Sequence, residues 1–257
     1  MSVDLTRPAV TRAGLRAEVL LVLGVSVGQS AIYAIVSLTA KLTADRPLSQ
    51  QTATLNASQS PRPWLDLTYQ LLGIAFALVP VLLAVHLLNR DRADARHALG
   101  VDLRRPGRDL GWGAALAAAI GLPGLLLVYV AATLGLNANL VPAALPDLWW
   151  AIPVLLLSAA QNAILEEVVF VGYLMTRLRD LELRTWAIIA SCALLRATYH
   201  LYQGFGGFVG NAVMGVVFAL FFLRTRRVLP LIIAHTLLDV VAFVGYTLVP
   251  KAWLSWL

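Results

Sequence analysis

The sequence predicts an all-α fold, a polytopic transmembrane helix bundle of about seven to eight helices. Of its 257 residues, 59% are hydrophobic and 13% are charged, and the mean hydropathy is +0.76. An ordinary soluble domain has about 25% charged residues. The charged residues lie between long apolar runs, as expected where water is present only at the ends of each segment. We therefore expect residues 1–257 to form a single membrane domain.

Seven apolar stretches approach the roughly 20 residues that a transmembrane helix needs. The first is longer than the apolar region of a secretory signal, so we expect an uncleaved first span. The predicted spans cover residues 18–43, 65–88, 110–135, 148–175, 185–203, 206–223 and 228–249.

Lysine and arginine predict the orientation of these spans. With a cytoplasmic N-terminus, fifteen of the 20 basic residues fall on the inner side and four on the outer side, while Arg196 lies within a span. This bias follows the positive-inside rule and predicts a multi-pass protein of the cell membrane, with the C-terminus outside. The net charge of +6 then faces lipid headgroups, so no nucleic-acid partner is expected.

Three features between or inside the spans carry no assigned chemistry. The loop 44–64 is rich in Ser, Thr, Gln and Pro and is predicted to be solvated. The segment 91–109 alternates charged and apolar residues, which favours the cytoplasmic membrane surface. The single cysteine, Cys192, lies in an apolar run and is predicted to be a packing residue.

Six ionisable residues fall inside the C-terminal spans, where each costs about 2.5 to 3.5 kcal/mol to insert, so they persist mainly where they pair or function. Two pairs have the four-residue spacing that places both members on one helix face. Glu166 and Glu167 are adjacent and point about 100° apart, so they cannot have the same role. The six are Glu166, Glu167, Arg196, His200, His235 and Asp239.

A hairpin relates the fourth and fifth spans. Glu166 lies 17 residues before Leu183, at the basic turn, and His200 lies 17 residues after it, so both reach the same depth in an antiparallel pair. Carboxylates and imidazoles at one depth suit a metal-bound or carboxylate-activated water. The alternative is a buried polar network that only fixes helix packing.

Three short motifs, in order and inside spans, resemble those of the CPBP intramembrane metalloproteases, which include the type II CAAX prenyl endopeptidases and the Abi bacteriocin-immunity proteins. The first family motif is Glu-Glu-x-x-x-Arg, the second Phe-x-x-x-His and the third His-x-x-x-Asn or Asp. The likeness covers about residues 148–249, which we expect to be the catalytic core. The matching segments are Glu166–Val171, Arg196–His200 and His235–Asp239.

The resemblance implies peptide-bond hydrolysis in an intramembrane catalytic cavity. It implies that Glu166 and His200 activate the water, that Glu167 supports them, and that His235 with Asp239 stabilises the oxyanion or completes a metal site. The resemblance leaves two alternatives, a zinc site and a metal-free site. The sequence lacks the His-Glu-x-x-His zinc motif. If a metal is bound, Glu166, His200 and His235 are its expected ligands.

Two positions depart from the family pattern together. Val171 stands where the first motif has arginine, and Arg196 stands where the second has an aromatic residue. Reflection through the hairpin places these positions at nearly the same depth. We therefore predict that Arg196 replaces the missing arginine and neutralises Glu167, or less readily Glu166.

Three classes of function follow. The first is an intramembrane endopeptidase acting on a membrane-associated or lipidated polypeptide, with membrane lipid as its surroundings. The second is a transporter that uses the same Glu and His residues as a proton relay, although no inverted repeat is visible. The third is a non-catalytic immunity or scaffold protein.

Overall fold

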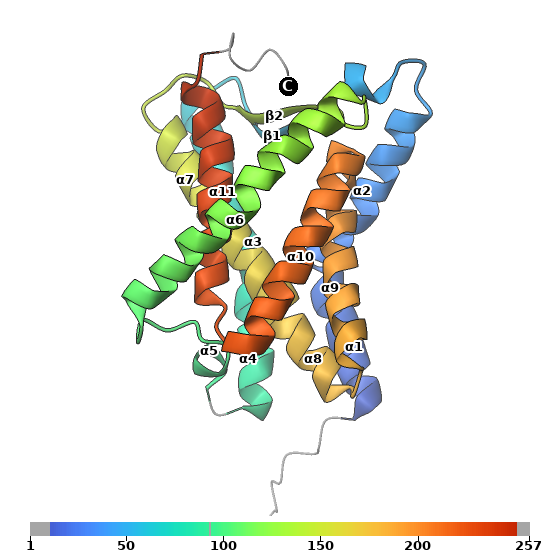
Figure 1. Ribbon diagram of the computed structural model, residues 1–257. Helices are drawn as coiled ribbons and strands as arrows, with labels where there is room; N and C mark the ends of the chain where they lie inside the picture. Colours follow the sequence, from blue (N-terminus) through green and yellow to red (C-terminus); the bar gives the residue numbers. More distant parts are fainter. Residues whose placement is uncertain (1–10, 93, 251–257) are drawn as a thin grey trace, which may run out of the picture.

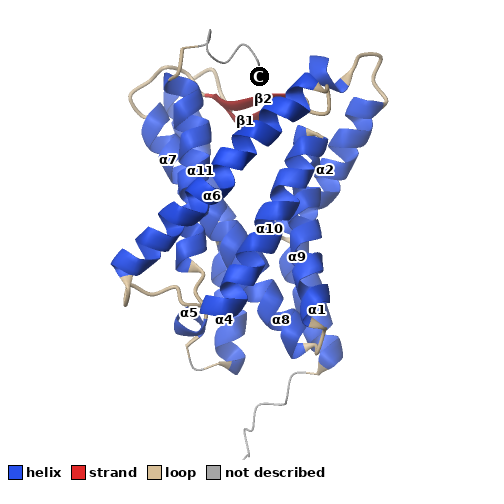
Figure 2. Ribbon diagram, in the orientation of Figure 1, coloured by secondary structure: helices blue, strands red, loops and turns tan. Residues whose placement is uncertain are grey.

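The computed structural model describes residues 11–92 and 94–250 and is 76% helical, which confirms the predicted all-α class. Figure 2 shows a bundle of helices with one small sheet at one end. The helices are α1 (Arg12–Gly24), α2 (Val27–Leu42), α3 (Pro63–Ala77), α4 (Val79–Asp91), α5 (Ala95–Ala98), α6 (Pro106–Thr133), α7 (Ala151–Glu166), α8 (Met175–Asp180), α9 (Thr185–Tyr199), α10 (Phe205–Thr225) and α11 (Leu229–Leu248). Shorter elements are the 3₁₀ turns η1 (Leu48–Gln50) and η3 (Leu201–Gln203), the π-helical η2 (Glu167–Leu174), and the strands β1 (Thr52–Ala57) and β2 (Asn139–Ala144).

Five helical stretches in the described residues are long and apolar enough to cross a membrane, or up to six if the α1–α2 pair, bent by 56°, is one span. The predicted seven to eight helices are therefore not confirmed. The physical reason is α9, which has only 15 residues although it packs along α10. The five stretches are Pro63–Asp91, Pro106–Thr133, Ala151–Asp180, Phe205–Thr225 and Leu229–Leu248.

The basic loops gather at one end of the bundle. The start of α1, the end of α4, α5, the α8–α9 turn and the α10–α11 turn lie together at the bottom of Figure 1, and both strands lie at the opposite end. This agrees with the sequence-based grouping of the basic residues. The orientation of these ends relative to a cytoplasm stays a prediction.

The segment 44–64 is largely exposed, as predicted, but it is more ordered than a solvated loop. Strand β1 pairs in parallel with β2, with Thr52 opposite Asn139 and Ala57 opposite Ala144. Burial of Leu48 and Ala53 against the end of α2 supports this order, since apolar contacts offset the entropy of fixing the chain.

The segment 91–109 docks against the bundle through Leu99, which is buried. Leu99 lies against Gly172 of η2, where a Cβ would approach its Cδ1 to 3.1 Å. The backbone N–H of Val228 donates to the carbonyl of Leu99 over 2.9 Å. Arg227 then pairs with Asp102 at 3.1 Å and with Asp109 at 2.6 Å. The segment therefore ties α6 and α11 together at the basic end.

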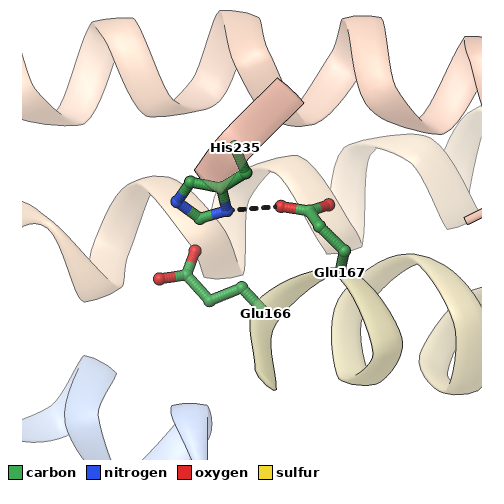
Figure 3. A group of neighbouring side chains, drawn as sticks. All are labelled: Glu166, Glu167 and His235. Atoms are coloured by element: carbon green, nitrogen blue, oxygen red, sulfur yellow. Dashed lines mark hydrogen bonds and ion pairs between the residues drawn. The ribbon is translucent and has the colours of Figure 1, made fainter. Parts of the chain in front are cut away.

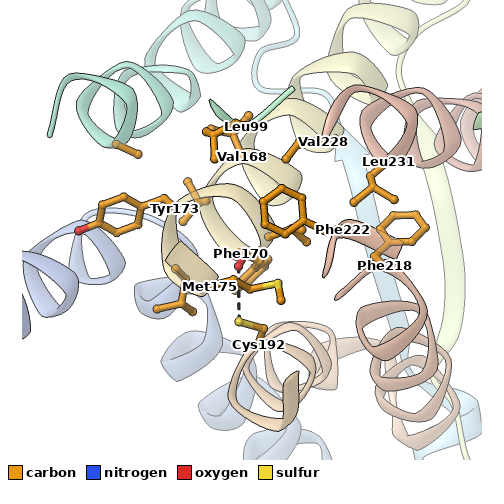
Figure 4. Packing of buried hydrophobic residues seen from close by; sticks show 14 of the residues in the cluster. Leu99, Val168, Phe170, Tyr173, Met175, Cys192, Phe218, Phe222, Val228 and Leu231 are labelled. Carbon is orange, nitrogen blue, oxygen red and sulfur yellow. Dashed lines mark hydrogen bonds between the residues drawn. The ribbon is translucent and has the colours of Figure 1, made fainter. Parts of the chain in front are cut away.

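The core surrounds η2, whose eight residues are all buried. Figure 4 shows Phe170 and Met175 packed among aromatic and aliphatic side chains of α10 and α11. Cys192 is buried, and its thiol donates to the carbonyl of Phe170 over 3.4 Å. Its predicted role in packing is confirmed.

Candidate active site

The two glutamates occupy a change of helix type. Glu166 is the last residue of α7 and Glu167 the first of the π-helical turn η2. Single π-helical turns are frequent at functional sites because they alter the direction of side chains without ending the helix. Both carboxylates are buried, with 3% and 0% of their residues exposed. In Figure 3 they lie on two sides of the His235 ring.

His235, on α11, is oriented by Glu167. Its Nδ1 lies 2.8 Å from Glu167 Oε1. An ionised carboxylate can only accept, so the favoured tautomer carries its proton on Nδ1 and donates it to Glu167. This leaves Nε2 as the reactive nitrogen, 3.7 Å from Asp239 Oδ1 one turn further along α11. Figure 3 shows the Glu166 carboxylate facing the ring edge that carries the two nitrogens.

Arg196, on α9, is buried among these groups with 1% of its residue exposed. Its NH1 lies 2.7 Å from Glu167 Oε1 and its NH2 lies 3.1 Å from Glu166 Oε2. The guanidinium also lies 5.5 Å from the centre of the Phe218 ring. The predicted pairing of Arg196 with the glutamates is therefore confirmed.

His200 follows the last residue of α9 and is only partly buried. Its Nδ1 lies 3.0 Å from the carbonyl oxygen of Arg196. A carbonyl can only accept, so Nδ1 carries the proton and Nε2 holds the lone pair. The ring interacts electrostatically with Glu166 and lies against Tyr199, with ring centres 4.6 Å apart.

Asn162 belongs to the same site, although the sequence analysis passed over it. It lies four residues before Glu166 on α7, and its side-chain amide interacts with the Asp239 carboxylate. The signal that could have found it is this spacing, which places Asn162 and Glu166 on one helix face.

Among the described residues, Glu166, Glu167 and His235 form a buried group whose potential ligand atoms all lie within 4.8 Å of one another. By residue type this group could bind a metal. It differs from the expected set, because Glu167 takes part and His200 does not.

With Arg196 in place, however, the group does not fit a resident divalent ion. The guanidinium nitrogens lie within 3.1 Å of both carboxylates and of His235 Nδ1. A metal bound to the same atoms would have to displace this cation or lie directly beside it.

The fold and this group together define a multi-pass membrane protein with a buried carboxylate, imidazole and guanidinium site. The family model described as type II CAAX prenyl endopeptidase Rce1-like matches residues 148–241, a segment that contains all six ionisable residues predicted from the sequence. This match confirms the family resemblance that the three motifs predict. No curated protein and no solved structure matches the chain.

Proposed function

We propose that the protein is an intramembrane endopeptidase that hydrolyses a peptide bond of a membrane-associated or lipidated polypeptide. The observation that carries the proposal is the Glu166 carboxylate, buried beside an imidazole that Glu167 orients, in the segment that matches the Rce1-like model. A buried ionisable site inside a helical bundle is costly, and catalysis is the most direct reason to retain it.

Glu166 acts as the general base. Its Oε2 makes no hydrogen bond to the described residues, although Arg196 lies 3.1 Å away. This oxygen accepts a proton from water as the water oxygen attacks the substrate carbonyl. When the tetrahedral intermediate collapses, the same proton passes to the leaving amine, so Glu166 ends as it began. His200 holds the water through the lone pair of Nε2.

His235 stabilises the negative charge on the carbonyl oxygen. In the imidazolium form of His235, the proton on Nδ1 is donated to Glu167 and the second proton, on Nε2, is donated to the oxyanion. Asp239, whose Oδ1 lies 3.7 Å from Nε2, offsets the positive charge of the protonated ring, and Asn162 interacts with Asp239 in turn. Arg196 supplies the positive charge that pairs with Glu167. No step requires a metal.

The membrane setting follows the sequence expectations. We place the N-terminus and the basic end in the cytoplasm of a cell whose membrane the bundle crosses, with lipid around it. The match to type II CAAX prenyl endopeptidases makes prenylated peptides the first substrates to test.

A hydrolysis assay in nanodiscs tests the proposal. Purified protein is incubated in ¹⁸O-labelled water with a pool of farnesylated, acylated and unmodified peptides of randomised sequence. We expect cleavage products with ¹⁸O in the new carboxyl group. The absence of cleavage together with proton flux in liposomes would favour a transporter, and the absence of both would favour a scaffold.

A further inference from the structure

A groove of about 480 Å³ opens on the surface of α2, beside η3. Five of its lining residues are on α2 and the sixth is on η3. They are Gln29, Ser30, Tyr33, Ala34, Ser37 and Tyr202. The groove is separate from the carboxylate site but lies against it, because the Tyr202 ring stacks on the His200 ring with centres 6.4 Å apart.

The groove is polar although the helix around it is apolar. Among the described residues, the side chains of Gln29, Ser30 and Ser37 have no hydrogen-bond partner. Ile32 and Val36, on the adjoining face of α2, are 65% and 60% exposed, as suits contact with lipid. Polar groups without partners are unfavourable in hydrocarbon. The groove therefore suits an occupant that offers hydrogen bonds rather than an acyl chain.

The wall formed by η3 is fixed. The backbone N–H of Ala138 donates to the carbonyl of Gln203 over 3.0 Å, which ties η3 to the residue before β2. Tyr202 also packs against the buried cluster that holds the end of α2. A fixed wall favours binding, because little ordering entropy remains to be lost.

We propose that this groove binds an extended stretch of the substrate polypeptide and leads it past Tyr202 to the site. The proposal rests on the proposed function and names the part of the substrate that the groove recognises, its backbone amides. From Gln29 to Ser37 the helix rises about 12 Å. An extended chain rises about 3.3 Å per residue, so about four substrate residues would lie along the groove.

Cysteine cross-linking tests the groove independently of turnover. Cys192, the only cysteine, is replaced by Ala, and Glu166→Gln prevents cleavage. Ser37→Cys is placed in the groove and Val36→Cys, its neighbour on the lipid face, is the matched control. Each variant in nanodiscs is exposed to the randomised peptide pool, now carrying biotin and a bromoacetyl group.

We expect Ser37→Cys to capture peptide about tenfold more than Val36→Cys, with unlabelled peptides competing. Equal labelling at the two positions would overturn the proposal, and so would a disulfide-linked dimer at Ser37→Cys, which would make the groove a contact between copies. The cross-linking assay needs no hydrolysis. If wild-type protein fails to cleave the pool, the proposed peptidase function is refuted, whereas peptide binding in the groove is still decided by the cross-linking result.

A second readout uses kinetics. Ser30→Ala with Ser37→Ala removes two hydroxyls from the groove, whereas Thr39→Val removes a hydroxyl that already donates to the carbonyl of Ile35 over 2.9 Å. We expect the double variant to raise KM about fivefold with kcat unchanged, since each lost hydrogen bond weakens binding modestly. An unchanged KM, or an equal effect of Thr39→Val, would contradict the inference.

Discussion

The guanidinium of Arg196, on α9, lies 2.7 Å from Glu167 Oε1, at the start of η2. The family pattern places an arginine four residues after Glu167, on the same helix, whereas this chain has Val171 there. The positive charge for the glutamates therefore comes from the neighbouring helix.

Returning the arginine to position 171, on η2, tests whether Arg196 replaces it. Arg196→Phe leaves two buried carboxylates without their cation, and we expect it to cost about 3–5 kcal/mol of stability. The double variant Val171→Arg with Arg196→Phe should recover much of this loss, measured by thermal unfolding in detergent. Arg196→Lys keeps the positive charge but loses the planar guanidinium that contacts both glutamates. Its thermal midpoint should lie between those of the wild type and Arg196→Phe. A double variant no more stable than Arg196→Phe would show that the exchange is not compensatory.

Arg196 should also exclude divalent ions from the glutamates. Wild-type protein dialysed against dilute zinc is expected to retain well below one ion per chain by elemental analysis. Arg196→Gln removes the competing cation and should raise zinc affinity at least about tenfold, or about 1.4 kcal/mol. Stoichiometric zinc in the wild type, lost on Arg196→Gln, would mean that Arg196 supports a metal rather than replacing one.

The sequence predicted the residues of the site better than their exact arrangement. Reflection through the hairpin placed Glu166 and His200 at one depth and Arg196 about one helical turn away. The Arg196 pairing was predicted from this reflection together with the paired departures at Val171 and Arg196. Depth does not fix direction around the helix. Since α9 ends at Tyr199, His200 turns towards η3 and stays outside the group that Glu167 joins.

Other parts of the fold could not be predicted from the local sequence pattern. The π-helical turn at Glu167 depends on packing around all its sides, and an apolar run cannot distinguish it from an α-helix. The pairing of β1 with β2 joins segments far apart in the sequence, of which the first was read as a loop for its polar composition. The bend between α1 and α2 divides what was predicted as one span.

Close contact between α9 and α10 should be required to position Arg196. A Cβ on Gly215 would lie 2.9 Å from the backbone Cα of Ala193 and 3.4 Å from Arg196 Cδ. We expect Gly215→Ala to destabilise the protein by about 1–3 kcal/mol through overpacking. Gly124→Ala on α6, where a Cβ meets nothing within 4 Å, is the control and should be neutral or stabilising. Equal thermal midpoints for the two variants would refute the contact's importance.

Acid should reduce the stability that Asp102 contributes at the basic end of the bundle. A hydrogen bond with His97, followed by the Arg104 N–H and the Arg227 guanidinium, lowers the pKa of Asp102 to about 2 from 3.8. Because the folded value is depressed, this stabilisation is complete above 3.8 and is lost as the pH falls towards 2.

The thermal midpoints of wild type and Asp102→Asn should therefore differ most at neutral pH and converge in strong acid, while Asp45→Asn, at an exposed position, serves as the control. A difference that does not change with pH would assign the effect to packing instead.

The most direct measurement compares single-turnover hydrolysis of a cleaved peptide by wild-type protein and by Glu166→Gln. The amide has nearly the shape of the carboxylate but cannot accept the water proton, so we expect the rate to fall by about 10³-fold, with peptide affinity and thermal midpoint close to wild type. Asp147→Asn, in the loop before α7, should cleave normally. Wild-type turnover by Glu166→Gln would contradict the account, because no role for Glu166 as the base would remain.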